Sequence, residues 1–118
     1  MLVFVSFIDV NIACVNTELN WTCPGGYLKV EYALWKTIDY RICNIKSSGR
    51  ASIFDVTTHM KTTCDNAISC DFTVNDSSFD VLCGEKCSGL DYSFECVSKS
   101  LVLPIVLIIF LNNLTRKQ

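Results

Sequence analysis

Eight cysteines in a chain of 118 residues constrain the fold more than any other feature of this sequence. Cysteine is this frequent in small secreted domains, where disulfide bonds supply the stability that a thin hydrophobic core lacks. Structural zinc is the competing use, but zinc sites favour Cys-x-x-Cys pairs and several histidines. No such pair is present, and His59 is the only histidine. We therefore expect four disulfide bonds and no metal site, and the spacing alone leaves the pairing open.

The charge pattern argues against nucleic acid as a partner. Ten basic and twelve acidic residues give a net charge of −2, and the basic residues are scattered singly along the chain. A surface that binds nucleic acid needs clustered lysines and arginines to neutralise phosphates. We expect a glycan or a cell-surface protein as the partner, and no nucleic acid.

The sequence contains no catalytic constellation. His59 stands alone in a segment of expected helix, and no cysteine is available as a nucleophile if all eight are bridged. Asp76, Asp80 and Glu85 lie close together, but they offer few ligands for calcium, so we expect a solvated loop. The chain is predicted not to be an enzyme and to use no cofactor.

An apolar run, Leu2–Ile8, lies near the start of the chain. We interpret residues 1–13 as a signal peptide with a small residue at its cleavage point, although the run is short and lacks preceding basic residues. The alternatives are a buried first strand and a start site that misses part of the leader. The oxidising compartment that the cysteines require favours the signal peptide, and with it a secreted or plasma-membrane location on the extracellular face.

A second apolar run, Leu101–Leu111, lies near the end and is followed by Arg116 and Lys117. We interpret residues 100–114 as a short membrane-anchoring segment and residues 115–118 as a basic tail, which matches a cytoplasmic flank. The run is shorter than an ordinary membrane span. A glycolipid-anchor signal and a core element are the alternatives, but the polar spacer that a glycolipid signal requires is missing.

The middle of the chain, residues 14–97, is the domain itself. Segments 27–33, 69–74 and 90–96 alternate apolar and polar residues, which predicts strands with one buried face. Ile53, Val56 and Met60 stand at helical spacing and predict one short helix beginning near Ser52. The expected fold is mainly β (α+β): a small disulfide-stapled antiparallel β-sandwich with one short helix and long loops.

Two sequons for N-linked glycosylation occur within this domain, at Asn20 and Asn75. In a secreted chain such triplets mark exposed segments. A third, at Asn113, lies beside the apolar run and is expected to be inert. Trp21 and Trp35 are candidates for stacking on a sugar or a partner, and one of the two is expected in the core.

The cysteine framework resembles that of the rhamnose/galactose-binding lectin domain, the sea-urchin-egg-lectin type found also in latrophilins. The resemblance covers about residues 12–97. It rests on Cys14, on Cys23-Pro24-Gly25 followed by the segment 28–37, and on Cys64 and Cys70 six positions apart. It also rests on the final block, in which Phe79 and Cys83 precede Leu90, Tyr92, Phe94 and Cys96 at the family spacing.

The resemblance implies three disulfide bonds directly: Cys14–Cys43, Cys23–Cys96 and Cys64–Cys70. The family's fourth cysteine, near Ala51 or Ser52, is absent, whereas an additional one, Cys87, follows Cys83. The simplest repair is a Cys83–Cys87 bridge in a tight turn, which Gly84 would help to form.

The resemblance also implies a galactose/rhamnose-type carbohydrate-binding function, with a degenerate pocket. Sugar-binding family members have a Glu, a Tyr, an Asn, an Asp and a Lys where this chain has Val15, Trp35, Asp76, Val81 and Ser88. Candidate sugar-binding residues are therefore Trp35, Asp76 and Glu31, which stands at the family's strand Glu. Because most polar contacts to a sugar are lost, the alternative is a protein-interaction or adhesion ectodomain that binds no sugar.

Overall fold

The structure, a computed structural model, describes residues 11–46 and 49–98. The predicted membrane-anchoring segment, the basic tail and residues 1–10 of the predicted signal peptide lie outside this part. In the described residues no helix is long and apolar enough to cross a membrane. The elements in chain order are β1 (Asn11–Cys14), β2 (Glu18–Thr22), β3 (Gly26–Lys36), α1 (Tyr40–Cys43), β4 (Ile53–Asp55), α2 (Thr57–Cys64), β5 (Ser69–Thr73), α3 (Asp76–Phe79), the 3-10 turn η2 (Gly84–Lys86) and β6 (Gly89–Ser98).

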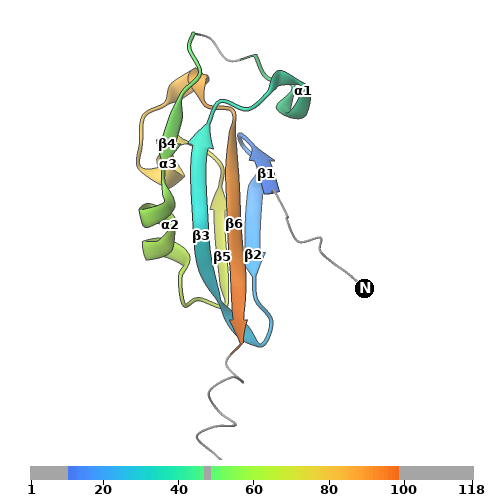
Figure 1. The fold of residues 1–118 in the computed structure, drawn as a ribbon, viewed down its shortest axis with the longest axis vertical. Coiled ribbons are helices and arrows are strands. Elements are labelled where there is room, and N and C mark those ends of the chain that lie inside the picture. The colour runs from blue at the N-terminus through green and yellow to red at the C-terminus, as the bar shows by residue number, and fades with distance from the viewer. Residues whose placement is uncertain (1–10, 47–48, 99–118) are drawn as a thin grey trace, which may run out of the picture.

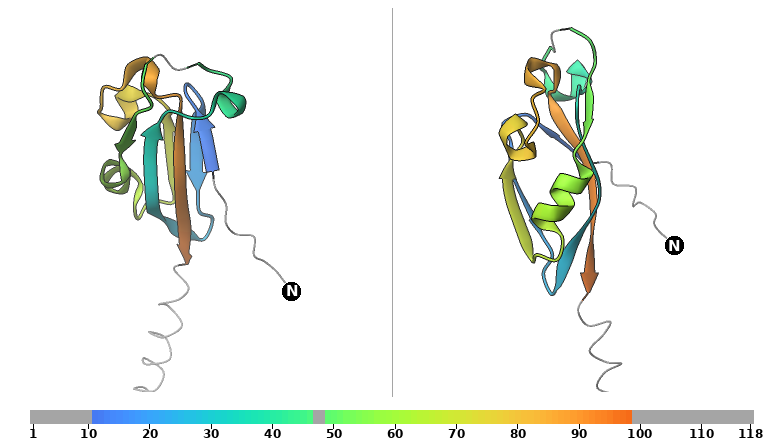
Figure 2. Two further views of the ribbon diagram at one scale, coloured as in Figure 1. Left: turned by 45° about the horizontal axis from the view of Figure 1, so that its top comes forward. Right: turned by 90° about the vertical axis from the view of Figure 1, so that its left-hand side faces the viewer.

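The strands form two antiparallel sheets, as the sequence predicts. One sheet has the order β1-β6-β3-β4, and β2 and β5 form the other. Figure 2 shows the two sheets as layers, with α2 beside them. The core fills the space between the layers: the Trp21 ring of β2 packs against Phe72, Tyr92 and Phe94, with ring centroids about 5 Å apart. The mainly-β fold class is therefore confirmed.

A bulge in strand β3 shifts the alternation of buried and exposed residues along the sequence. Leu28 and Val30 are buried before it, and Ala33 and Trp35 after it, so the alternation slips by one residue. The register against β6 shifts between Val30 and Tyr32, which leaves Glu31 as the extra residue. A bulge of this kind lets one strand keep its apolar side chains in the core on both sides of an irregularity.

The prediction of a single helix beginning near Ser52 is wrong in two respects. Residues Ile53–Asp55 form strand β4, which pairs with the end of β3, and α2 begins at Thr57. Ile and Phe suit an edge strand, and the Asp55 side chain accepts a hydrogen bond from the Thr57 backbone where the helix begins. The described part also contains two four-residue helices, α1 and α3, that no periodicity could reveal.

Three of the four disulfide bonds join the pairs that the resemblance implies, and the fourth is the Cys83–Cys87 bridge expected in place of the family's missing pair. The four bonds are Cys14–Cys43, Cys23–Cys96, Cys64–Cys70 and Cys83–Cys87. Cys23–Cys96 links the β2–β3 connection to the far end of β6, and Cys83–Cys87 spans η2. Gly84 begins that turn with a positive φ of 68°, a conformation that glycine adopts at little cost.

The molecule has two distinct ends. β6 runs the length of the domain, from the end that carries α1 and η2 to the end where the described chain stops at Ser98 (Figure 1). The loops after β3 and before β6 therefore lie at the end opposite Ser98. We call this end the tip and define it as residues 39–46, 49–52 and 84–87.

Candidate functional site

Trp35 and Asp76 meet, but they do not form an open sugar pocket. Trp35 is 1% exposed, so its ring has no free face for stacking on a ligand. Its indole nitrogen donates a hydrogen bond to Asp76 Oδ1 at 2.7 Å. The ring also packs against Phe79, with the centroids 5.3 Å apart. The interpretation of Trp35 as a stacking surface is corrected: both tryptophans, Trp21 and Trp35, belong to the core.

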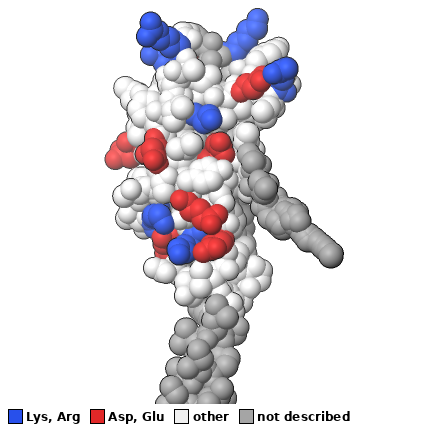
Figure 3. Space-filling model, in the orientation of Figure 1, with Lys and Arg blue, Asp and Glu red and all other residues white. Residues whose placement is uncertain are grey.

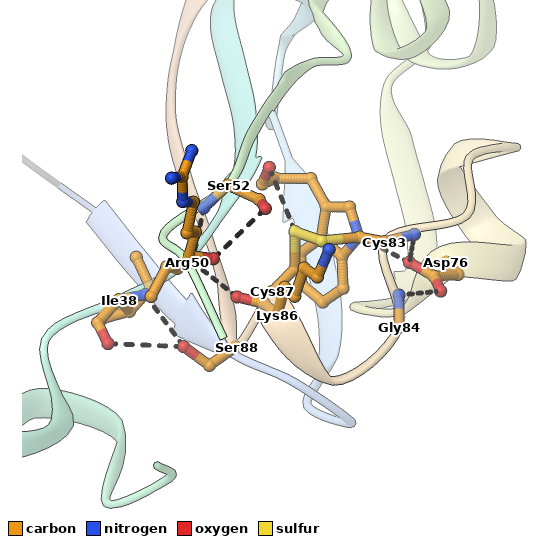
Figure 4. Close-up of a disulfide and its surroundings, with 11 residues drawn as sticks. Ile38, Arg50, Ser52, Asp76, Cys83, Gly84, Lys86, Cys87 and Ser88 are labelled. Atoms are coloured by element: carbon orange, nitrogen blue, oxygen red, sulfur yellow. Dashed lines mark hydrogen bonds between the residues drawn. A yellow bond between two sulfur atoms is a disulfide. The ribbon is translucent and has the colours of Figure 1, made fainter. Parts of the chain in front are cut away.

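Asp76 uses its carboxylate within the protein. Besides the Trp35 indole, the backbone N–H groups of Cys83 and Gly84 donate to it at 3.1 and 2.8 Å (Figure 4). Burial raises the pKa of Asp76, but the hydrogen bonds from Gly84, Trp35 and Cys83 outweigh burial and lower that pKa below its ordinary value of 3.8. Asp76 therefore anchors the disulfide-bonded turn at η2, and it is not the freely solvated residue expected in this loop.

The other positions that match the family pocket are also changed. Ser88 is fully buried, and its hydroxyl accepts a hydrogen bond from the Ile38 backbone at 2.9 Å (Figure 4). Val81 packs against the core and lines a shallow hollow with Asp76 and Leu82. Val15 lines a different, open cavity. Among the five positions that correspond to sugar-binding residues of the family, Val15 alone contributes an apolar side chain to a cavity at the tip.

The cavity at Val15 has a volume of about 470 Å³. Val15 and Ile45 provide its apolar lining, together with the Cys83–Cys87 bridge at Cys87. Lys46 and Glu85 supply its charged groups, and Gly84 contributes backbone. Sequence reasoning missed this cavity because its lining comes from three separate segments, none of which contains a recognisable motif.

Glu31 lies away from this cavity, at the bulge in β3. Its carboxylate accepts a hydrogen bond from the Ser93 hydroxyl of β6 at 2.5 Å, and the residue is exposed. The structure thus brings Trp35 and Asp76 together but does not join Glu31 to them. As the extra residue of the bulge, Glu31 keeps its charged side chain in solvent.

The two candidate glycosylation residues have different surroundings. Asn20 is exposed on β2, where its side chain bonds to Asp71 across the sheet and to Thr22. Asn75 precedes α3 and caps it: its side-chain oxygen accepts from the Ser78 backbone N–H at 2.8 Å. A glycan is attached at the amide nitrogen. The Asn75 contact uses the oxygen and does not involve that nitrogen, whereas the Asn20 nitrogen donates to Asp71 and would have to give up this hydrogen bond.

His59 has a structural contact. Its Nε2 lies 2.7 Å from the Ser78 carbonyl oxygen and thereby links α2 to α3. Within residues 11–46 and 49–98, no group of three or more His, Cys, Asp or Glu side chains is arranged to hold a metal ion.

No protein-family model matches this chain, and no curated protein matches it in sequence.

Proposed function

We propose that this chain is a carbohydrate-binding domain of lectin type that works outside the cell without catalysing a reaction. The framework resemblance supports the proposal, and so does the agreement of three disulfide bonds, Cys14–Cys43, Cys23–Cys96 and Cys64–Cys70, with that framework. Four bridges with no free cysteine among the described residues are also consistent with an oxidising, extracellular environment. Tethering through residues 100–114 stays a prediction from the sequence.

The observation that carries the proposal is the position of the open cavity at the tip. Val15 occupies the place of a sugar-contacting Glu in the family, and it lines this cavity. The residues that would complete a family pocket, Trp35 and Asp76, are instead bonded to one another. We propose that the ligand site has moved from these residues to a neighbouring set at the same end of the domain.

The lining of the cavity suits part of a sugar. Val15 and Ile45 offer apolar surface for the C–H face of a ring, whereas Lys46 and Glu85 can bond to its polar substituents. Few polar groups converge there, and hydroxyls that lose water without a partner cost free energy. We therefore do not expect tight binding of neutral rhamnose or galactose.

A glycan-array screen of the full oxidised chain tests the proposal. We expect binding that is weakened by Lys46→Ala, which removes a charged group of the cavity. Lys29→Ala, at an exposed ion pair with Glu95 on the β3–β6 sheet, is the control and should leave binding unchanged. Asp76→Ala is unsuitable as a test, because it removes three hydrogen bonds of the fold. Failure of the folded chain to bind any glycan would contradict the proposal.

A second candidate is a protein-interaction or adhesion ectodomain on the same scaffold. Tyr40 and Ile42 of α1 favour it, because they are 50% and 56% exposed at the tip. Exposed aromatic and aliphatic side chains are common anchors at protein interfaces. If this candidate is right, the native chain will bind to cells stripped of surface glycans. The variants Tyr40→Ser and Ile42→Ser will then lose this binding.

A further inference from the structure

The tip differs in charge from the rest of the domain. Its described residues include four basic and two acidic side chains, whereas the remaining described residues include three basic and nine acidic ones. Figure 3 shows blue side chains at the upper end and most red ones lower down. A positive end on a protein of net negative charge creates a local field that attracts anions.

Three of the four basic residues at the tip lie outside the ion pairs of the described part. Four basic residues of the described part form ion pairs, in Lys29–Glu95, Lys36–Asp91, Arg41–Asp39 and Lys61–Asp65. The three others, Lys46, Arg50 and Lys86, take part in none of these four pairs, and all three lie at the tip.

These three residues come from separate segments of the tip. Lys46 lines the cavity together with Glu85, the neighbour of Lys86. A side-chain carbon placed on Gly49, next to Arg50, would lie 3.8 Å from Cε of Lys86. The backbone of Lys86 is held in place, because its carbonyl oxygen accepts a hydrogen bond from the Thr37 hydroxyl at 2.5 Å (Figure 4).

Apolar surface lies beside these charges. Lys46 stands over the half-exposed Tyr40 ring, 5.8 Å from its centroid. A ligand that carries both anionic groups and a sugar ring could therefore contact the cations and the apolar cavity wall together. Charge-assisted hydrogen bonds from Lys and Arg to sulfate or carboxylate are stronger than those to neutral hydroxyls.

We infer that the ligand is an acidic polysaccharide, bearing sulfate or carboxylate groups, bound by Lys46, Arg50 and Lys86 at the cavity of the tip. This inference rests on the proposed carbohydrate-binding function and specifies its ligand class. The tip faces away from Ser98, after which the apolar C-terminal run follows in sequence (Figure 1). A chain tethered through that run would present the tip outward, toward polysaccharide of the matrix or of another cell.

The test uses the full chain, oxidised and held in mild detergent, with heparin oligosaccharide as the sulfated probe. The variant Lys46→Gln/Lys86→Gln removes two charges at the tip, and Lys29→Gln/Lys36→Gln removes two from the β3–β6 sheet. We expect about tenfold weaker binding for the tip variant and near-native binding for the control, with both variants equally folded. Desulfated heparin should bind more weakly than heparin.

Each other outcome overturns the inference in a distinguishable way. Equal weakening by both variants would mean that net charge alone governs binding. Binding to neutral glycans but not to heparin would leave the proposed function standing and remove the acidic ligand. Tighter binding to vesicles of anionic lipid than to heparin would assign the tip to a membrane surface. Absence of binding to any glycan would refute the inference and the proposed function together.

Discussion

At the scale of single residues, the Asp76 carboxylate connects three parts of the chain. It accepts hydrogen bonds from the Trp35 side chain in β3 and from two backbone groups at η2. Asp76→Ala would leave the buried Trp35 N–H without a partner, so we expect a loss of about 3 kcal/mol in the free energy of unfolding. Urea denaturation followed by tryptophan fluorescence measures it.

A matched substitution separates this anchoring from a simple change of charge. Asp80→Asn removes one acidic charge at an exposed residue with a positive φ of 55°, a conformation that Asn also adopts. We expect Asp80→Asn to change stability by less than about 0.5 kcal/mol. If Asp76→Ala and Asp80→Asn had equal effects, the three hydrogen bonds would contribute nothing to stability.

The same carboxylate predicts a dependence on pH. The pKa of Asp76 is lower in the folded protein than its ordinary value of 3.8, so the unfolded state takes up the proton first as the pH falls. The stabilisation is thus fully present above about pH 4 and is lost as the pH falls through the folded pKa. We expect the stability difference between the native chain and Asp76→Asn to shrink from pH 7 to pH 2.5. A difference that does not change with pH would contradict this.

Single residues also show what the sequence could and could not predict about the site. The resemblance singled out Trp35 and Asp76 as a pair, and the structure does bring them into contact. Their orientation was not predictable, because whether an indole faces solvent or core depends on the position of the bulge at Glu31. The cavity lining was equally hidden: Val15, Ile45 and Gly84 are unremarkable residues until the fold brings them together.

At the scale of elements, α2 covers the edge of β3 that β4 is too short to reach. Side chains at every fourth position along α2 and at its C-terminal cap form hydrogen bonds to the backbone of that edge. These are Thr57, Lys61 and Asp65. Asp65 accepts from the Val30 N–H at 2.7 Å, and Lys61 donates to the Val30 carbonyl at 2.7 Å. The helix therefore satisfies backbone groups that a neighbouring strand would otherwise pair.

This arrangement predicts the effect of changing Asp65. Asp65→Ala leaves the N–H of the buried Val30 without an acceptor, which should cost about 2 kcal/mol of stability. Asp65→Asn keeps an acceptor oxygen and should cost less than half as much. Thermal unfolding followed by circular dichroism compares the two. Equal losses would show that the charge of Asp65, and not its bond to Val30, stabilises this edge.

The predicted elements agree with the structure where the alternation is long. Segment 90–96 lies within β6, and segment 27–33 lies within β3. The helix was predicted to begin near Ser52 because Ile53 and Val56 fit a helical period. In the structure, Ile53–Asp55 pair with β3 and form a strand instead. Tertiary pairing of this kind overrides local spacing, and a single sequence does not reveal it.

At the scale of the whole molecule, the disulfide bonds close chain segments of very different lengths. Cys23–Cys96 spans 73 positions and ties the β2–β3 connection to β6, whereas Cys83–Cys87 spans four. A cross-link stabilises chiefly by restricting the unfolded chain, and the effect increases with the length of the closed segment. The longest bridge therefore acts on the folding of the entire domain, and the shortest acts on the turn beside the cavity.

Two double variants test this division of roles. Cys23→Ala/Cys96→Ala should lower the free energy of unfolding by about 4 kcal/mol, and Cys83→Ala/Cys87→Ala by about 2 kcal/mol. Because η2 and Cys87 border the cavity, the second variant should weaken ligand binding more than its smaller effect on stability suggests. Urea denaturation and the glycan binding assay, applied to both variants under conditions where each is folded, measure the two quantities. If the folded Cys83→Ala/Cys87→Ala variant bound the ligand no more weakly than the folded Cys23→Ala/Cys96→Ala variant, the short bridge would have no part in shaping the site.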